Sequence, residues 1–168
     1  MGSSGIGLAA SKLFSSHGAF VTIADLSPPS EPVLNPTFAR CDVTSWETIL
    51  AAFEILVQKH RTVDVLIANA SVGEVEDFFL DVLDDEGKLK QPKYTVLDIN
   101  LKGVLDCVKV AIHYMRQQER RGAIVMRAST VRLRWRERTP HLLSSQTWGN
   151  YIPYEYDPSL EDEMICSC

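Results

Sequence analysis

Short apolar runs alternate with amphipathic helical patterns over about the first 128 residues of this 168-residue chain, and this alternation constrains the fold more than any other feature. The order is helix, strand, strand, helix, strand, helix, strand. Strands that alternate with helices in this way form parallel sheets with helices on both faces. The pattern therefore predicts a doubly wound α/β domain with right-handed crossover connections.

Three segments show helical periodicity. The first follows a glycine-rich turn and ends near Gly18, a residue typical of a helix C-terminal cap. The second begins at a capping-box pattern from Thr44 to Glu47, and the third is a long pattern from about 93 to 118. The residues expected to face inward from the first two helices are Ile6, Ala9, Ala10, Leu13, Phe14, Trp46, Ile49, Leu50, Phe53, Leu56 and Val57.

Four runs are typical of short strands: AFVTIAD (19–25), TFARCDV (37–43), VDVLIANA (63–70) and GAIVMRAS (122–129). The third run is continuously apolar, as expected for a strand covered on both faces. From Thr130 onward the sequence becomes arginine-dense, then turn-rich, then acidic. We therefore expect residues 1–129 to form the domain and residues 130–168 to form a divergent, poorly ordered tail.

Composition argues against several classes of function. The net charge is −5, and the arginines after Thr130 are offset by nearby acids, which argues against a nucleic-acid partner. The chain has no apolar run of about 18 residues and no recognisable secretory signal, so we expect no membrane span and a cytoplasmic location. Its four cysteines lack zinc-ligand spacing, so no metal site is expected.

The chain opens with MGSSGIG, directly before the first helical pattern. Small residues let the backbone approach a pyrophosphate, and the free N–H groups and dipole of the first helical turn attract its negative charge. Asp25 ends the next strand, 18 positions after Gly7. A carboxylate there can accept hydrogen bonds from a ribose and would repel a 2′-phosphate, which favours NAD over NADP. Taken separately, the two features could also be an ordinary turn and a solvated strand-end aspartate.

Together with later motifs, these features resemble the short-chain dehydrogenase/reductase family in its compact single-domain form. The matching positions, in chain order, are the glycine motif from Gly2 to Gly7, Asp25, Asp42-Val43, Ala68-Asn69-Ala70-Ser71, Asn100 in DINLKGV and Ser129 in GAIVMRAST. The resemblance covers residues 1 to about 130. It implies a Rossmann-like parallel sheet and NAD(P)-dependent hydride transfer between a small-molecule alcohol and a carbonyl.

The resemblance also implies residue roles. Cofactor contacts would come from Gly2, Ser4, Gly5, Ile6 and Gly7 at the pyrophosphate, Asp25 at the ribose, Asp42 and Val43 at the adenine, and Asn69 and Ala70 in the cleft. Ser129 would hydrogen-bond the substrate oxygen, and Asn100 would hold a proton-relay water. Structural alternatives stay open, because Asn69 and Ser129 could be ordinary strand-end residues and Asn100 an ordinary polar residue on a helix.

The acid–base pair of the family has no counterpart in this sequence. The family places a tyrosine about a dozen residues after the serine, and a lysine four positions later. A phenol with a pKa near 10 needs such a cation to exchange protons near neutral pH. Leucines and His141 occupy the expected region, and no lysine follows Lys109. We therefore expect turnover to be absent or very low; His141 or Tyr151 as a replacement acid has no support.

The resemblance further implies a strand before Gly2, in the middle of the sheet, and two later strands; none has a counterpart here. Without the central strand, AFVTIAD and VDVLIANA each keep an unpaired edge, and each buried unpaired backbone group costs about 1–3 kcal/mol. Three outcomes are open. The two strands could close up, or the tail could fill the gap, with Val131–Trp135 as a candidate edge strand. In the third outcome the chain is only marginally stable, because the unpaired groups use up much of a typical folding free energy of about 5–15 kcal/mol.

Three functional hypotheses follow. The chain is an oxidoreductase of this family, weakened by its missing residues. Alternatively, it is a non-catalytic nucleotide-binding fragment that forms a homo-oligomer or pairs with a full-length relative through the helix at about 93–118. In the third hypothesis, altered splicing or an altered reading frame after Thr130 has produced a chain without an independent function.

Overall fold

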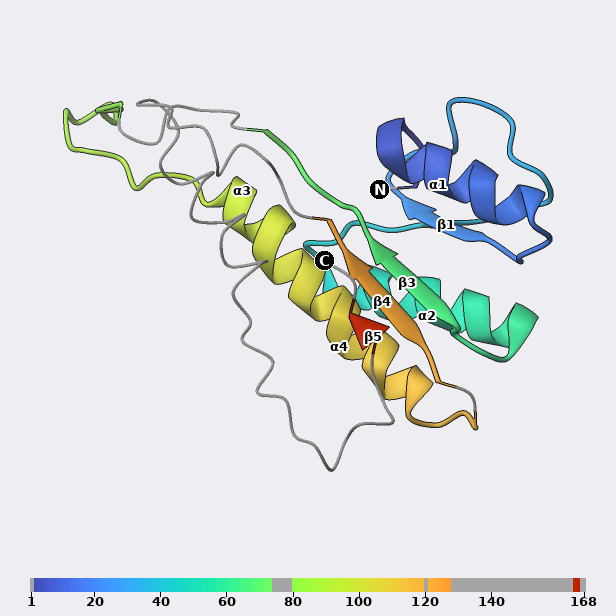
Figure 1. The fold of residues 1–168 in the computed structure, drawn as a ribbon. Coiled ribbons are helices and arrows are strands. Elements are labelled where there is room, and N and C mark those ends of the chain that lie inside the picture. Colours follow the sequence, from blue (N-terminus) through green and yellow to red (C-terminus); the bar gives the residue numbers. More distant parts are fainter. Residues whose placement is uncertain (1, 74–79, 120, 128–164, 167–168) are drawn as a thin grey trace.

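The computed structural model describes residues 2–73, 80–119, 121–127 and 165–166 (Figure 1). The elements in chain order are α1 (Gly5–Ser16), β1 (Thr22–Asp25), β2 (Thr37–Arg40), α2 (Trp46–His60), β3 (Val65–Ala68), α3 (Thr95–Leu97), the π-helix η1 (Asp98–Gly103), α4 (Val104–Met115), β4 (Ala123–Met126) and β5 (Ile165–Cys166). The predicted alternation of helices with short strands is confirmed.

The strands form two parallel sheets. β1 pairs with β2, so that Thr22 lies opposite Thr37. β3 pairs with β4, with Val65 opposite Ala123, and β5 adds to the outer edge of β4. Within the described ranges no ladder joins β1 to β3. The predicted doubly wound parallel fold is therefore present in partial form, and its sheet is divided between β1 and β3.

The predicted tail contributes one short strand that the sequence did not indicate, β5, which pairs in parallel with β4. Residues 128–164 lie outside the described residues, and they include Ser129 and Val131–Trp135. The division of the chain at residue 130, and the suggestion that Val131–Trp135 forms an edge strand, therefore stay predictions.

The hydrophobic core lies between the two sheets and a layer formed by α2 and α4. The two helices pack together, and the rings of Phe53 and Tyr114 stack with centroids 5.9 Å apart. The buried cluster consists of Ala39, Cys41, Ile49, Ala52, Phe53, Val63, Val110, Ala111 and Ile124. Because Ala39 belongs to β2 and Ile124 to β4, this shared core connects the two sheets, although no ladder does.

The inward face predicted for α1 is mostly wrong. Ile6, Ala9, Leu13 and Phe14 are exposed and Ala10 is half-buried, whereas Leu8 is buried. α1 lies beside β1 at the divided part of the sheet (Figure 1), so only a narrow apolar surface is available to cover it. Gly18 does follow the helix with a φ of +83°, as expected of a cap.

The other two helices differ from their predicted form in detail. The N-cap of α2 is Ser45, not Thr44, because the Ser45 side chain accepts the N–H of Thr48 at 3.4 Å. The long helix predicted from about 93 to 118 is three elements, with a six-residue π-helix between α3 and α4. None of the helices described is long and apolar enough to cross a bilayer.

Candidate cofactor site

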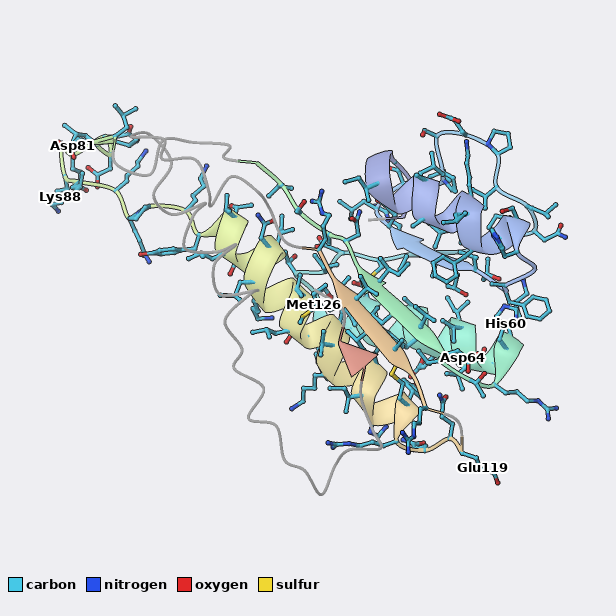
Figure 2. All side chains as sticks on the ribbon, in the orientation of Figure 1. His60, Asp64, Asp81, Lys88, Glu119 and Met126 are labelled. Atoms are coloured by element: carbon cyan, nitrogen blue, oxygen red, sulfur yellow. The ribbon has the colours of Figure 1, made fainter. Side chains whose placement is uncertain are left out.

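The predicted cofactor residues that the structure describes gather at the carboxyl ends of the strands. Asp25 ends β1, Asp42-Val43 follow β2, and Asn69-Ala70 follow β3. In Figure 2, Met126 marks the carboxyl end of the β3–β4 sheet and Asp64 the opposite end. In open parallel sheets, ligands bind outside the carboxyl ends of the strands, so these positions form one candidate site.

The glycine-rich turn, residues 2–7, leads into the first turn of α1. Gly5 has a φ of +51°, a left-handed conformation that glycine adopts at least cost. Ser4 is the N-cap, but its side chain makes no capping hydrogen bond, and the first helical bond runs from the Leu8 N–H to the Ser4 carbonyl at 3.1 Å. Ser4, Gly5 and Ile6 are exposed. The first-turn N–H groups are thus available to an anion from solvent.

Asp25 holds this turn against the end of β1. One carboxylate oxygen accepts the backbone N–H of Ser3 at 3.0 Å, and the other accepts that of Leu26 at 2.7 Å. Both Asp25 and Ser3 are buried. The carboxylate therefore has a structural role that the sequence did not reveal. Each oxygen keeps a second lone pair that a ribose hydroxyl could use.

Ser3 is a neighbour of the candidate site that the sequence analysis did not identify. Its backbone N–H binds Asp25, and its hydroxyl donates to the Ser27 carbonyl at 2.6 Å. Its backbone carbonyl accepts the N–H of Ser30 at 3.0 Å. Ser3 thereby joins the turn to the loop after β1. A serine among glycines looks like any small turn residue, so composition alone could not have identified it.

Asp42 and Val43 are held in place by contacts with nearby residues. One oxygen of Asp42 accepts the backbone N–H and the hydroxyl of Thr44, at 2.9 and 2.7 Å. These bonds hold the pKa of Asp42 below its usual range, and the bond from the backbone N–H has the larger effect. The carboxylate is therefore ionised at neutral pH. Val43 packs against Gly103, where an added Cβ would lie 2.9 Å from the Cβ of Val43. No pattern in the sequence indicated this contact.

Asn100 binds the chain that follows β3. Its side-chain oxygen accepts the Val72 N–H at 2.8 Å, and its side-chain nitrogen donates to the Val72 carbonyl at 2.9 Å. This two-bond contact makes Asn100 a positioning residue for the loop beyond Asn69 and Ala70. The water-relay role predicted for it remains a prediction, as do the roles of Ser129, His141 and Tyr151, which lie outside the described residues.

Two cysteines lie at or beside the hydrophobic core: Cys41 is buried and Cys107 is half-buried. Burial raises the pKa of Cys41, and it raises the pKa of Cys107 to about 12. Both side chains are therefore neutral thiols at physiological pH and poor metal ligands. In the part of the chain that the structure describes, no three His, Cys, Asp or Glu residues are grouped so that they could hold a metal ion.

Comparison with known proteins gives a consistent result. Residues 2–140 match the model of the short chain dehydrogenase family. The chain is 42% identical, over 130 residues, to the short-chain dehydrogenase/reductase prx4 of Penicillium roqueforti, covering 76% of this chain and 38% of that protein. Over 134 residues it is also 42% identical to ATR7 of Stachybotrys chlorohalonatus, covering 79% and 40%. The chain thus spans about two fifths of the length of these relatives.

Solved structures share the fold. The ligand-free aldohexose dehydrogenase of Thermoplasma acidophilum superposes with a TM-score of 0.69 at 23% identity, over 87% of this chain and 53% of that one. A 4-hydroxyisoleucine dehydrogenase complexed with NADH gives the same TM-score and identity, over 88% and 61%.

Proposed function

Because the chain belongs to the short-chain dehydrogenase/reductase family, we propose that its carboxyl-end site binds NAD in an oxidoreductase that converts small-molecule alcohols and carbonyls. The observation that carries this proposal is the uncapped, exposed first turn of α1, held to the end of β1 by the buried carboxylate of Asp25. Helix N–H groups that attract an anion, next to an acid that can bind a ribose, suit a dinucleotide.

The residues present fit this cofactor. Gly2, Ser4, Gly5, Ile6 and Gly7 would receive the pyrophosphate, and Asp25 the adenosine ribose. A Cβ at residue 2 would come within 3.0 Å of the Ile23 side chain, so a glycine lets the turn lie directly on β1. Asp42 and Val43 would border the adenine, and Asn69 and Ala70 the cleft. When bound, the nicotinamide supplies the acceptor for a hydride from an alcohol.

A preference for NAD over NADP is the first expected result. The Asp25 carboxylate should repel a 2′-phosphate by about 1.4 kcal/mol or more, which is a tenfold difference in Kd. Thermal melts over a concentration series measure both Kd values, because NAD at ten times its Kd should stabilise the fold by about 1.4 kcal/mol. In Asp25→Asn the ratio of the two Kd values should fall towards one.

Asp25→Asn also disturbs the bonds to Ser3 and Leu26 and can therefore lower stability. Lost stability weakens the binding of both cofactors alike, so the ratio of the two Kd values separates the effect on cofactor preference from loss of stability. Wild-type chain that binds the two cofactors equally well would contradict the assignment of Asp25. A cooperative melt with no shift at millimolar NAD would contradict cofactor binding itself.

We also propose that turnover is absent or very low, that residues 1–129 carry the binding function ahead of a divergent tail, and that the chain is cytoplasmic. The tyrosine and the lysine that the family places after its serine have no counterpart here, so the proton of the reaction would have to move without them. The absence of turnover is tested by measuring the formation of reduced nicotinamide cofactor with a panel of alcohols. Measurable turnover that disappears in Ser129→Ala would contradict it.

A second candidate function is pairing with another copy or with a full-length relative. α4 supports it, because Leu105 is 40% exposed and, with Val108 and Ile112, borders a shallow surface depression. Size-exclusion chromatography with light scattering decides between the candidates. A monomer at micromolar concentration, with no relative bound after purification, would contradict pairing.

A further inference from the structure

The loop between β1 and β2 contains the segment 27–36, here called the strap. Its sequence is SPPSEPVLNP, in which Pro28, Pro29, Pro32 and Pro36 are prolines, and it contains no helix or strand. Proline has no backbone N–H to donate to a ladder, and it restricts the residue before it to extended conformations. The position of the strap therefore depends on its contacts with the rest of the molecule.

Ser3 fastens the first part of the strap to the glycine-rich turn. Its hydroxyl donates to the Ser27 carbonyl at 2.6 Å, and its carbonyl accepts the N–H and the hydroxyl of Ser30 at 3.0 and 3.2 Å. The Ser3 N–H binds the buried carboxylate of Asp25 at 3.0 Å. Ser27 is thus bonded directly to the turn that is proposed to receive the pyrophosphate, two residues after the acid that is proposed to bind the ribose.

The second part of the strap is held by the later turns of α1. Lys12 forms an ion pair with Glu31, and the Ser15 hydroxyl donates to the Leu34 carbonyl. The strap therefore runs beside α1 from the glycine-rich turn towards the C-terminal end of the helix.

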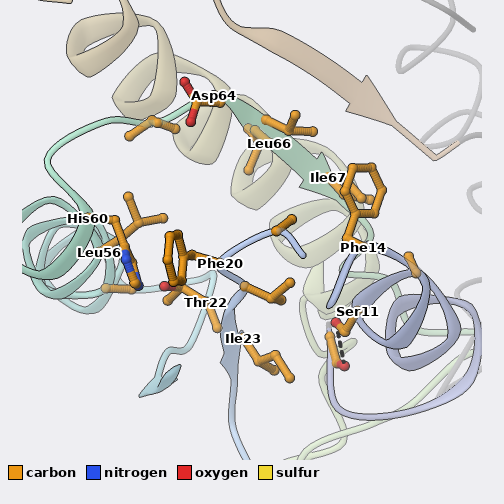
Figure 3. A pocket seen from close by; sticks show the side chains of 18 of the residues that line it. Ser11, Phe14, Phe20, Thr22, Ile23, Leu56, His60, Asp64, Leu66 and Ile67 are labelled. Carbon is orange, nitrogen blue, oxygen red and sulfur yellow. Dashed lines mark hydrogen bonds between the residues drawn. The ribbon is translucent and has the colours of Figure 1, made fainter. Parts of the chain in front are cut away.

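Another side of α1 borders a cavity of about 390 Å³ between β1 and β3 (Figure 3). Ser11 and Phe14 of α1 line this cavity, whereas none of the residues that hold the strap does. β1 and β3 therefore do not close up, which was one of the three outcomes that the sequence left open. The contacts of the strap lie away from this division of the sheet.

Ser27 differs from Ser30, the other serine of the strap, in what its hydroxyl does. The Ser30 hydroxyl is bonded to Ser3, whereas the Ser27 hydroxyl makes no hydrogen bond in the part of the chain that the structure describes. Ser27 is exposed, and so is Pro28 after it. A serine directly before a proline, in an exposed loop, is the acceptor to which proline-directed protein kinases transfer phosphate.

We propose that Ser27 is a phosphorylation site for a proline-directed protein kinase, and that its phosphate opposes the binding of the dinucleotide beside Asp25. The effect on binding, but not the acceptor site, rests on the proposed cofactor function. In the reaction, a bond forms between the Ser27 oxygen and the γ-phosphorus of ATP, and the bond from that phosphorus to the β–γ bridging oxygen breaks. ADP leaves, and the hydroxyl proton passes to the catalytic aspartate of the kinase.

The charges around Ser27 determine the direction of the effect. A phosphoserine carries a charge of about −1.5 to −2 at pH 7. The Asp25 carboxylate and the pyrophosphate are also negative, and Lys12, the cation that α1 places against the strap, is already paired with Glu31. The phosphate would therefore repel the dinucleotide. Salt should reduce this repulsion, because the Debye length falls from about 10 Å at 0.1 M to about 3 Å at 1 M.

Phosphorylation of the full chain tests the acceptor site. Thr139 before Pro140 is the other hydroxyl residue that precedes a proline in the sequence, so every chain in the experiment also carries Thr139→Ala. The chain is incubated with a proline-directed kinase, ATP and Mg²⁺, and mass spectrometry counts and locates the phosphate. We expect one phosphate, on Ser27, and none in Ser27→Ala.

Thermal melts over a series of NAD concentrations test the effect on binding. Phosphorylation should raise the Kd for NAD about tenfold at 0.1 M salt and less than about threefold at 1 M salt. A change of the fold alone would not depend on salt in this way. Ser27→Ala should bind NAD as the unmodified chain does, because the contact with Ser3 uses the backbone carbonyl of residue 27.

Two aspartate substitutions supply a matched control, since each adds one negative charge to the strap. Ser27 follows the carboxyl end of β1, whereas Asn35, also exposed, lies two residues before the start of β2. Because β1 and β2 are parallel, these two positions lie near opposite ends of the strands. Ser27→Asp should raise the Kd for NAD about threefold at 0.1 M salt, and Asn35→Asp should leave it nearly unchanged.

The absence of phosphate on Ser27 would overturn the proposal, whatever the nucleotide does. A phosphate there that leaves the Kd unchanged would also overturn it, and would indicate that Arg40, opposite Asp25 in the register of β1 and β2, neutralises the added charge. Equal weakening by the two aspartate variants would show that the effect does not depend on the Asp25 site. An unmodified chain that does not bind NAD would contradict the proposed function and the regulation together, while the mass measurement would still decide whether Ser27 is the acceptor.

Discussion

Replacing Asn100 with alanine is expected to lower the free energy of unfolding by about 2–4 kcal/mol. The side chain makes two hydrogen bonds to the backbone of Val72, and the substitution leaves both the N–H and the carbonyl of Val72 without that partner. Each partly buried group left unsatisfied costs about 1–3 kcal/mol. Urea denaturation of the full chain, followed by circular dichroism, measures the difference.

Two further variants make this result specific. Asn100→Asp keeps an acceptor for the Val72 N–H but loses the donor to its carbonyl, so its loss of stability should be smaller. Asp98→Ala alters an exposed residue of the same π-helix and should change stability by less than about 0.5 kcal/mol. If Asn100→Ala is as stable as Asp98→Ala, the two bonds to Val72 do not hold the loop.

Gly103→Ala is expected to destabilise the fold by about 1–3 kcal/mol, although alanine is the better helix former by about 1 kcal/mol. The added Cβ would lie 2.9 Å from the Cβ, Cγ2 and backbone oxygen of Val43. The backbone oxygen cannot turn aside as a side chain can, so η1 or the segment after β2 must move. The same denaturation experiment measures the effect.

A second glycine provides the control, because a Cβ at Gly73 would meet nothing within 4 Å and Gly73→Ala should be nearly neutral. Val43→Ala should partly rescue Gly103→Ala, since it removes the Cγ2 contact but not the contact with the backbone oxygen. A Gly103→Ala chain more stable than the wild type would show that the close approach of η1 to Val43 is absent in solution.

The strands and helices were predictable because hydrophobic periodicity determines them. The VDVLIANA run contains β3, and the Ser45 region begins α2 within one residue of the predicted cap. The π-helix from Asp98 to Gly103 was not predictable. It adds residues to a helical turn without interrupting the apolar pattern, and a count based on 3.6 residues per turn cannot detect it.

The site was predictable as a set of positions but not as a set of contacts. The spacing from Gly7 to Asp25 indicated a glycine-rich turn close to an acid at a strand end, and in the structure the turn lies beside Asp25 at the end of β1. It could not show that Asp25 is buried and bonded to Ser3, because the path of the turn decides this. Likewise, the open edge of β3 leaves Val65 exposed, although its sequence pattern predicted cover on both faces.

Because no ladder joins β1 to β3 in the described residues, α1 and β1 can open separately from the rest of the fold. The core cluster draws its buried residues from β2, α2, α4, β4 and the start of the β3 segment, and none from α1 or β1. Amide hydrogens of α1 and β1 should therefore exchange with deuterium through a local opening of low free energy. Those of β4 and α4 should exchange only through global unfolding. The interrupted sheet thus makes the half of the molecule that carries the glycine-rich turn its least cooperative part.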